Sequence, residues 1–204
     1  FIDSFENVKD NIKDSNPKTI ILDYGGPNIG KPLHVGHLRS LNIGRSLYEI
    51  NKLAGHSVFN DIHLGDWGMP IAQIICYIDK ENIDINDINI EDLEKIYPEA
   101  SSQYTNNKEF NELAKLINKQ LNENEKELIE KWSKIKKISV DSIKRVLEML
   151  HHEFDIWNGE SDVNNLIPDM LNNLKEEKKI SLDKGAYVSN FDADPKILIA
   201  KSDG

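Results

Sequence analysis

Hydrophobic positions between residues 19 and 80 follow two repeating patterns. Short apolar runs bounded by turn formers, at 19–24 and 57–62, predict two strands, the first of them buried. Each run is followed by a glycine-containing loop and then by apolar residues that share one helix face: Ile43, Leu47, Ile50 and Leu53 in the first helix, and Ile71, Ile74, Ile75 and Ile78 in the second. This alternation predicts an α/β fold with a parallel sheet, in which ligands bind beyond the carboxyl ends of the strands.

The pattern changes after residue 79. Acidic and Asn-rich segments lead into apolar residues at helical spacing: Phe110, Leu113, Ala114 and Ile117, then Leu128, Trp132 and Ile135, then Val146, Leu147, Leu150 and Phe154. Strand-like runs return at 186–191 and 197–200. We therefore expect a mostly helical insertion at 80–185, followed at 186–204 by strands that return to the first domain.

Composition limits the classes of function. The formal net charge of −10 argues against a surface that wraps nucleic acid through its overall field, so any contact with RNA is expected to be local. No apolar run approaches the roughly 20 residues that span a bilayer, and no signal peptide is recognisable. The chain begins with Phe1 and stops at Gly204 directly after a strand-like run, so both ends look like cuts through a larger protein.

Cysteine and histidine usage gives no sign of a metal centre. Cys76 is the single cysteine and lies in an apolar run, which predicts a buried structural thiol in a reducing cytoplasm. His151 and His152 are neighbours without a third spaced ligand. We expect no zinc site.

The loop after the first predicted strand holds the clearest chemistry. Lys31, His34 and His37 are three potential cations where a strand gives way to a helix, and free amide groups at a helix N-terminus already attract anions. The two imidazoles are one helical turn apart, and Gly36 between them leaves the backbone bare for a flat ring such as adenine. This pattern indicates a site for a nucleotide polyphosphate.

A P-loop is the competing interpretation, because residues 25–31 match G-x-x-x-x-G-K directly after a strand. A P-loop requires Ser or Thr at the next position to hold magnesium, together with free backbone amides that face phosphate. Pro32 supplies neither, and Pro27 removes an amide from the middle of the cradle. The sequence therefore argues against a P-loop.

The segment His34-Val35-Gly36-His37 resembles the HIGH signature of class I aminoacyl-tRNA synthetases and related nucleotidyltransferases. With P-N-x-x-K before it and L-R-S after it, the string from Pro27 to Ser40 resembles the arginyl-tRNA synthetase family in particular. Further landmarks of that family follow in order: Gly65-Asp66-Trp67-Gly68, Ile96-Tyr97, Phe154-Asp155, Gly159-Glu160-Ser161, Gly185-Ala186 and Ser202-Asp203-Gly204. Gly25, Gly26 and Gly30 depart from the family pattern, which usually has small hydroxyl or alanine-type residues there.

The resemblance implies a Rossmann-like (HUP-type) fold in a ligase that activates L-arginine with ATP and Mg²⁺. Arginyl-adenylate then passes its arginyl group to the acceptor end of tRNA(Arg). It also implies that 1–18 is a linker from a preceding domain and that 19–79 is the first half of the catalytic domain. We expect a cytoplasmic monomer without membrane contact, and little aminoacylation by residues 1–204 alone.

The family pattern also implies roles for individual residues. Lys31, His34 and His37 are the expected catalytic residues and, with Gly36, the expected ATP ligands. Arginine is expected beside the end of the first strand, in contact with Asp23, Gly26, Pro27, Asn28 and His37. From the residues alone, a solvated or turn-capping role for Asp23 and a turn role for Asn28 stay open.

Three later residues are weaker candidates. Trp67 is expected to be a packing residue, and Asp66 is expected to order its loop or to cap the next helix. Glu160 is the weakest candidate of the three for a functional role. Two other functions stay open: a different HxGH nucleotidyltransferase that adenylates a small carboxylate, and a nucleotide-binding module without catalysis.

Overall fold

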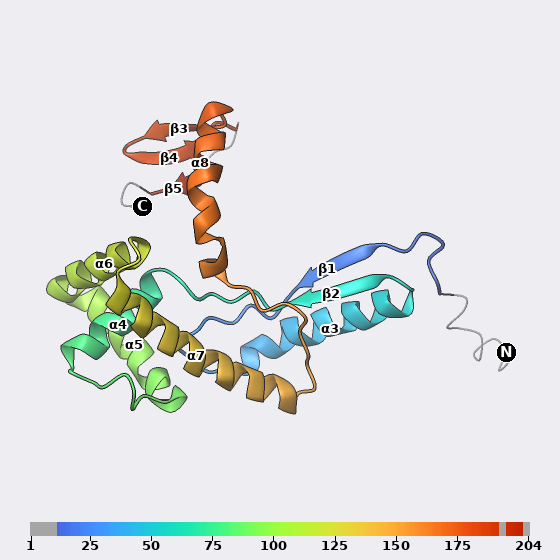
Figure 1. Cartoon of the computed structure of the whole chain (residues 1–204), viewed down its shortest axis with the longest axis horizontal. Coiled ribbons are helices and arrows are strands. Elements are labelled where there is room, and N and C mark those ends of the chain that lie inside the picture. The colour runs from blue at the N-terminus through green and yellow to red at the C-terminus, as the bar shows by residue number, and fades with distance from the viewer. Residues whose placement is uncertain (1–11, 192–194, 202–204) are drawn as a thin grey trace.

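The computed structural model describes residues 12–191 and 195–201, so the predicted linker at 1–18 and the landmark at 202–204 lie partly or wholly outside it. Two parallel strands, β1 (Thr19–Asp23) and β2 (Ser57–Asp61), pair in register from Thr19 with Ser57 to Asp23 with Asp61. Between them in the chain come a short 3-10 helix, η1 (Val35–His37), and the helix α3 (Leu38–Leu53), which packs along the strand pair (Figure 1). The predicted α/β fold with a parallel sheet is confirmed.

The packing of this unit differs from the sequence prediction in two respects. β1 was expected to be buried, but Ile21 is 65% exposed, because α3 covers one face of the pair and the described residues place no second layer over Ile21. The predicted apolar face of α3 is also exposed, with Ile43 at 56% and Ile50 at 61%. The helix instead turns Leu41 and Gly44 inward.

Gly44 explains why α3 packs on that face. A Cβ at this position would overlap the aromatic ring of Tyr24, the residue that follows β1. A glycine in the helix interior costs about 1 kcal/mol relative to alanine. Here it allows the ring to lie directly on the helix backbone, so close approach decides the packing face and hydrophobic periodicity does not.

Two loops leave the carboxyl ends of the strands and run side by side. We call residues 24–34 the β1 loop and residues 62–68 the β2 loop. The amide of Ile29 donates to the Gly65 carbonyl oxygen over 3.0 Å, and the amide of Gly65 donates to the Pro27 carbonyl oxygen over 3.1 Å. A third extended segment joins on the other side, where the amide of Leu64 donates to the Asn158 carbonyl oxygen over 2.8 Å.

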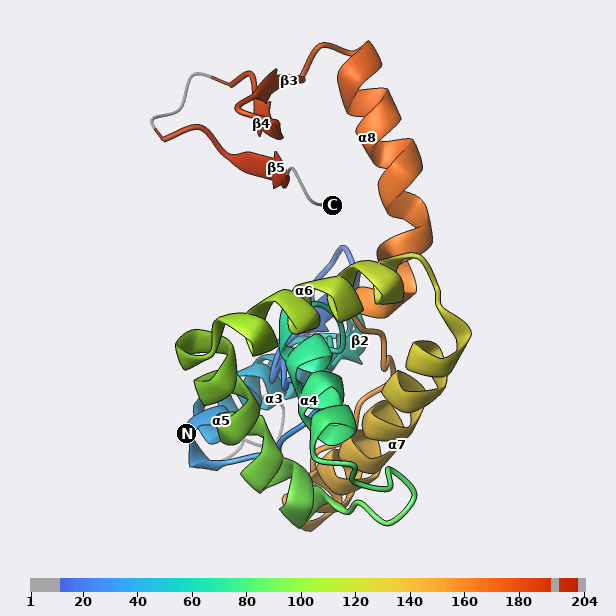
Figure 2. The same ribbon diagram turned by 90° about the vertical axis from the view of Figure 1, so that its left-hand side faces the viewer.

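A bundle of four helices follows the β2 loop: α4 (Met69–Lys80), α5 (Ile90–Asn106), α6 (Lys108–Asn122) and α7 (Lys126–Met149). The apolar α4 packs against the other three (Figure 2), and its predicted face is buried, with Ile71, Ile74, Ile75 and Ile78 at most 2% exposed. Side chains of Asn89, Asn107 and Glu125 cap the next three helices by accepting backbone amides. Cys76 is buried, as predicted, and burial raises the pKa of its thiol.

The segment η2 (Glu160–Leu166) lies against the β2 loop and α7, where Ser161 contacts Asp66 and Lys136. The strands that follow stand apart from the helical bundle in both views (Figures 1 and 2). After η2 come α8 (Ile167–Glu176), β3 (Ile180–Asp183), β4 (Ala186–Ser189) and β5 (Leu198–Ala200). Strands are present near the expected positions, but β4 pairs antiparallel with both β3 and β5 in a separate sheet and not with β1 or β2. The domain boundaries inferred from the sequence remain predictions.

Candidate active site

The carboxyl ends of β1 and β2 bring two carboxylates to one edge. Asp23 and Asp61 are register partners at the last position of each strand. Asp61 is partly buried, and this burial, together with the negative charge of Asp23, raises the pKa of its carboxyl group. His63 Nδ1 lies 4.0 Å from Asp61 Oδ2 and opposes this effect. Asp23 itself is exposed and free to face a cationic ligand.

In the β1 loop a buried residue and an exposed residue are neighbours in the chain. Ile29 is fully buried in the core cluster of the bundle, whereas the neighbouring Asn28 is exposed. Gly26 adopts a φ of +46° and Gly30 a φ of +85°, a region that side chains disfavour. Pro27 is buried, and its carbonyl oxygen accepts the Gly65 amide. The loop therefore holds Asn28 outward by fixing the backbone on both sides of it.

The Lys31 side chain extends from this loop toward the helical bundle. Its Nζ lies 5.2 Å from the ring centroid of Tyr97 on α5, within the range of a cation–π contact. The ammonium group is only partly buried, so it remains available to an anion. Sequence reasoning placed Tyr97 among the family landmarks without a role, and the structure shows that it steadies Lys31.

His34 and His37 lie together, as their spacing predicted. Their ring centroids are 4.2 Å apart with an angle of 48° between the ring planes. The amide of Gly36 donates to His34 Nδ1 over 3.1 Å, which leaves Nε2 of the neutral His34 ring to carry the proton and to act as an exposed donor. Such a donor is suited to a phosphate oxygen.

The surroundings of His37 disfavour a positive charge on its ring. Burial lowers the pKa of its imidazole, and electrostatic interactions with His34 and Lys31 lower it further, against a hydrogen bond to the His34 backbone that raises it. Its Nδ1 lies 3.3 Å from the His34 amide nitrogen and 3.2 Å from the His34 carbonyl oxygen. The lowered pKa favours the neutral ring, which would act on a ligand as a dipolar hydrogen-bonding group.

The structure explains why a glycine is needed at position 36. A Cβ here would come within 2.8 Å of His34 Cε1 and 2.9 Å of His34 Nδ1. The bare backbone thus makes room for the His34 ring. Stacking of adenine on Gly36 remains a prediction.

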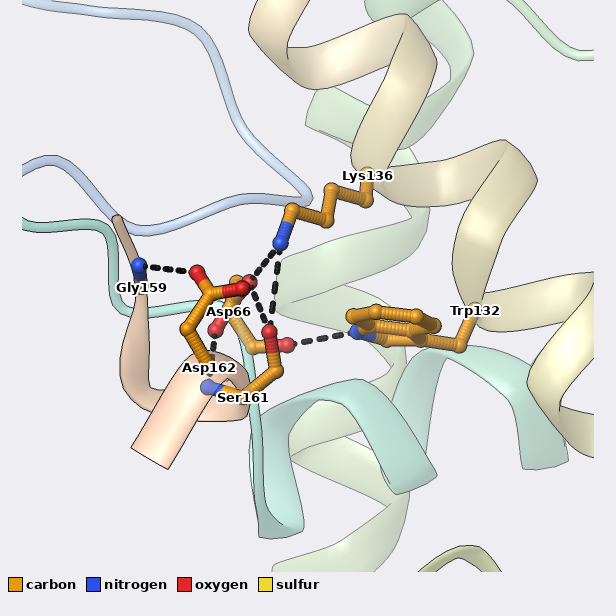
Figure 3. Close-up of polar contacts among 6 residues, drawn as sticks. All are labelled: Asp66, Trp132, Lys136, Gly159, Ser161 and Asp162. Carbon is orange, nitrogen blue, oxygen red and sulfur yellow. Dashed lines mark hydrogen bonds and ion pairs between the residues drawn. The ribbon is translucent and has the colours of Figure 1, made fainter. Parts of the chain in front are cut away.

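Asp66 orders its loop and does not cap the next helix. Its side chain is fully buried and accepts hydrogen bonds from the Ser161 amide over 2.8 Å and from Ser161 Oγ over 2.7 Å (Figure 3). Lys136 Nζ on α7 lies 2.5 Å from Asp66 Oδ2. The N-terminus of α4 has Gly68 at the capping position and no side-chain cap. Trp67 packs edge-on against Trp132, with ring centroids 5.3 Å apart, as expected for a packing residue.

Several residues of this region escaped sequence reasoning. Asp61 could have been found, because parallel pairing places the ends of both predicted strands at one edge. Lys136 and Ser139, whose Oγ accepts the Gly30 amide over 2.9 Å, could not, because nothing in an amphipathic helix indicates which polar residues face a distant loop. Glu160 is exposed, and its amide donates to the Leu64 carbonyl oxygen over 3.0 Å, so its backbone holds the β2 loop.

A cavity of about 510 Å³ lies elsewhere, between α3 and the end of α7. Its lining combines acidic, basic and aromatic side chains and includes none of Lys31, His34 and His37. Among the described residues, no three His, Cys, Asp or Glu side chains come together as a metal site. None of the described helices is both long and apolar enough to cross a membrane.

Residues 4–204 match the family described as tRNA synthetases class I (R), catalytic domain. The chain belongs to this family. Arginine–tRNA ligase of Agathobacter rectalis is 38% identical over 212 residues, covering 94% of this chain and 36% of that protein. The ligase of Francisella tularensis subsp. novicida is 33% identical over 203 residues, covering 92% and 35%. The chain thus spans little more than a third of the length of these relatives.

Solved structures of the class I arginyl synthetase family share the fold. The crystal structure of arginyl-tRNA synthetase from Plasmodium falciparum superposes with a TM-score of 0.74 at 26% identity, covering 95% of this chain and 34% of that one. The Thermus thermophilus enzyme superposes with a TM-score of 0.66 at 19% identity, covering 98% and 36%, and supports the fold alone. Family membership therefore agrees with the resemblance found in the motif around His34 and His37.

Proposed function

We propose that the protein carrying this chain activates L-arginine with ATP and transfers the arginyl group to tRNA(Arg). The observation that carries this proposal is the close pair of His34 and His37 rings, with Lys31 near enough to lower the pKa of His37, in a chain of the class I arginyl synthetase family. The relatives named above are arginine–tRNA ligases. Activation is an in-line phosphoryl transfer, which depends on positioning and charge stabilisation more than on covalent help.

The ATP phosphates would lie against η1. The Nε2–H of His34, the neutral ring of His37 and the ammonium group of Lys31 supply the donors and the positive charge that oxygens on phosphorus require during the transfer. Adenine would stack near Gly36. Mg²⁺ would enter as the complex with ATP, because the described residues group no set of side chains to hold it alone.

L-arginine would lie beside the end of β1. Asp23 is an exposed carboxylate suited to the guanidinium group, and Asn28 points outward from a loop held on both sides. The backbone of Gly26 and Pro27 would line the same place, and His37 would contact the substrate carboxylate. The acceptor end of tRNA would make a local contact, in keeping with the net charge of −10. We also propose that the protein is a cytoplasmic monomer that binds no zinc. Its domains would have the boundaries predicted from the sequence, with the helical insertion at 80–185.

The decisive experiment is ATP–pyrophosphate exchange by the full-length protein with each standard amino acid, with and without tRNA(Arg). Exchange that depends on arginine supports the proposal. Exchange with another carboxylate and none with arginine would favour a different HxGH nucleotidyltransferase. Nucleotide binding without any exchange would favour a binding module.

A matched pair of variants tests the role of Lys31. Removal of one group that stabilises developing charge costs on the order of 10²–10³ in rate, so Lys31→Met is expected to lower exchange by that factor. Lys80→Met is the control, because Lys80 Nζ lies 5.6 Å from the Phe110 ring centroid in a similar cation–π contact away from η1. Equal losses in both variants would remove the catalytic role of Lys31.

A further inference from the structure

The insertion helix α7 contacts both loops of the candidate site from one side. Lys136 reaches Asp66 in the β2 loop over 2.5 Å. One turn further along the helix, Ser139 Oγ accepts the amide of Gly30 in the β1 loop over 2.9 Å. Asp66, Gly30 and Ser139 are buried, so the contact between Ser139 and Gly30 is shielded from water, whereas the Lys136 side chain is 24% exposed.

Asp66 makes most of the hydrogen bonds and ion pairs of this connection. Its carboxylate receives Lys136 and two donors from Ser161, while its backbone carbonyl oxygen accepts Trp132 Nε1 from α7 over 2.7 Å (Figure 3). A Cβ at Gly159 would come within 2.6 Å of the carboxylate, so the segment before η2 also closes around it. These partners together hold the buried carboxylate in place.

The position of Asp66 sets that of Asn28 through Gly65. The backbone of Gly65 exchanges hydrogen bonds with Pro27 and Ile29, the two neighbours of Asn28. A Cβ on Gly65 would overlap the Asn28 side chain, so the two residues are in direct contact. A shift of Asp66 therefore displaces Gly65 and, with it, the side chain that faces the substrate region.

We propose that Lys136 and Asp66 are positioning residues for substrate binding: the ion pair between Lys136 and the buried Asp66 couples the position of α7 through Gly65 to Asn28, while Ser139 fixes Gly30 beside Lys31. This rests on the proposed function, since the affected step is the binding of the amino acid. The helical insertion is then part of the machinery that orders the substrate loops and is more than a separate appended bundle.

The chain offers a matched control on the same helix. Lys131 Nζ lies 2.7 Å from Asp79 Oδ1, and its side chain is 19% exposed, compared with 24% for Lys136. This pair ties α7 to the end of α4 without contact to either loop. Lys131 also lies 2.8 Å from Glu127 Oε1, and both of its acidic partners are more exposed than Asp66, so its loss removes an ion pair of a similarly exposed lysine and leaves Asp66, Gly65 and Asn28 in place.

The first test compares Lys136→Met, Lys136→Arg and Lys131→Met in the full-length protein by amino-acid-dependent pyrophosphate exchange. Because a misplacement of about 1 Å can cost on the order of 10²-fold, Lys136→Met is expected to raise KM for arginine at least tenfold, with a smaller change in KM for ATP. Lys136→Arg is expected to restore most of the affinity, and Lys131→Met to change KM less than twofold. Equal KM values in Lys136→Met and Lys131→Met would overturn the proposal.

A second readout does not depend on the substrate. Hydrogen exchange at the amides of Ile29 and Gly30 is expected to speed up in Lys136→Met and to stay slow in Lys131→Met. Unchanged protection in Lys136→Met would overturn the positioning role even if arginine activation is confirmed. If the wild-type protein exchanges with no amino acid, the proposed function fails, while the hydrogen-exchange result still decides the connection between α7 and the β1 loop.

Discussion

The Gly30 amide donates a hydrogen bond to Ser139 Oγ over 2.9 Å, across a sequence separation of 109 residues. Ser139 Oγ donates in turn to the Ile135 carbonyl oxygen over 2.7 Å, so its single proton is used within α7. Gly30 directly precedes Lys31, which the structure directs toward Tyr97. The base of the β1 loop is thus held by a helix of the insertion.

Ser139→Ala is expected to leave the buried Gly30 amide without an acceptor. An unsatisfied buried donor costs about 1–3 kcal/mol, so the free energy of unfolding should fall by that amount in urea titrations. Ser142→Ala, at a buried position in the same helix, is the control and should cost less. Similar losses in the two variants would show that the Gly30 contact contributes little.

Gly36→Ala is expected to displace the His34 ring, because the added methyl group would lie within 2.9 Å of two ring atoms. The displaced ring loses its hydrogen bond from the Gly36 amide. Arginine-dependent exchange should fall about as far as in His34→Ala, and the double variant should be no worse than His34→Ala. Additive losses would instead mean that Gly36 acts independently of His34, as in direct contact with adenine.

The His37 imidazole should titrate below its ordinary pKa of 6.5. Because the folded-state pKa is lowered, the unfolded chain binds the proton more readily, so stability contributed by neutral His37 is lost as pH falls below 6.5 toward the lowered pKa. Lys31→Met removes a like charge and should raise the pKa of His37 in an NMR titration. A pKa that falls or stays constant would contradict this electrostatic contribution.

Asp61→Asn should stabilise the protein at neutral pH. Burial and Asp23 raise the pKa of Asp61 above 3.8, so the folded state binds the proton more tightly and stability falls as pH rises through the raised value. The amide cannot ionise, so the melting temperature of Asp61→Asn should exceed that of the wild type at pH 7 and approach it near pH 3. Asp23→Asn should lower the pKa of Asp61.

Local features were predictable because they depend on neighbours in the chain. The strand at 19–23, the turn to η1 and the proximity of His34 and His37 follow from apolar runs, glycines and a spacing of three residues. The argument against a P-loop followed from the chemistry of Pro32 and Pro27. These inferences needed no tertiary contact, because backbone preferences and side-chain types act over a few residues.

The sequence by itself therefore determined the parallel α/β unit and the group of Lys31, His34 and His37. Tertiary structure decided which face of α3 packs, the lowered pKa of His37 and the partners of Asp66, one of which lies 95 residues away. Each of these depends on burial and on groups from separate elements that meet only after folding. A buried polar side chain takes whichever partner packing brings to it, and no local pattern in the chain encodes that choice.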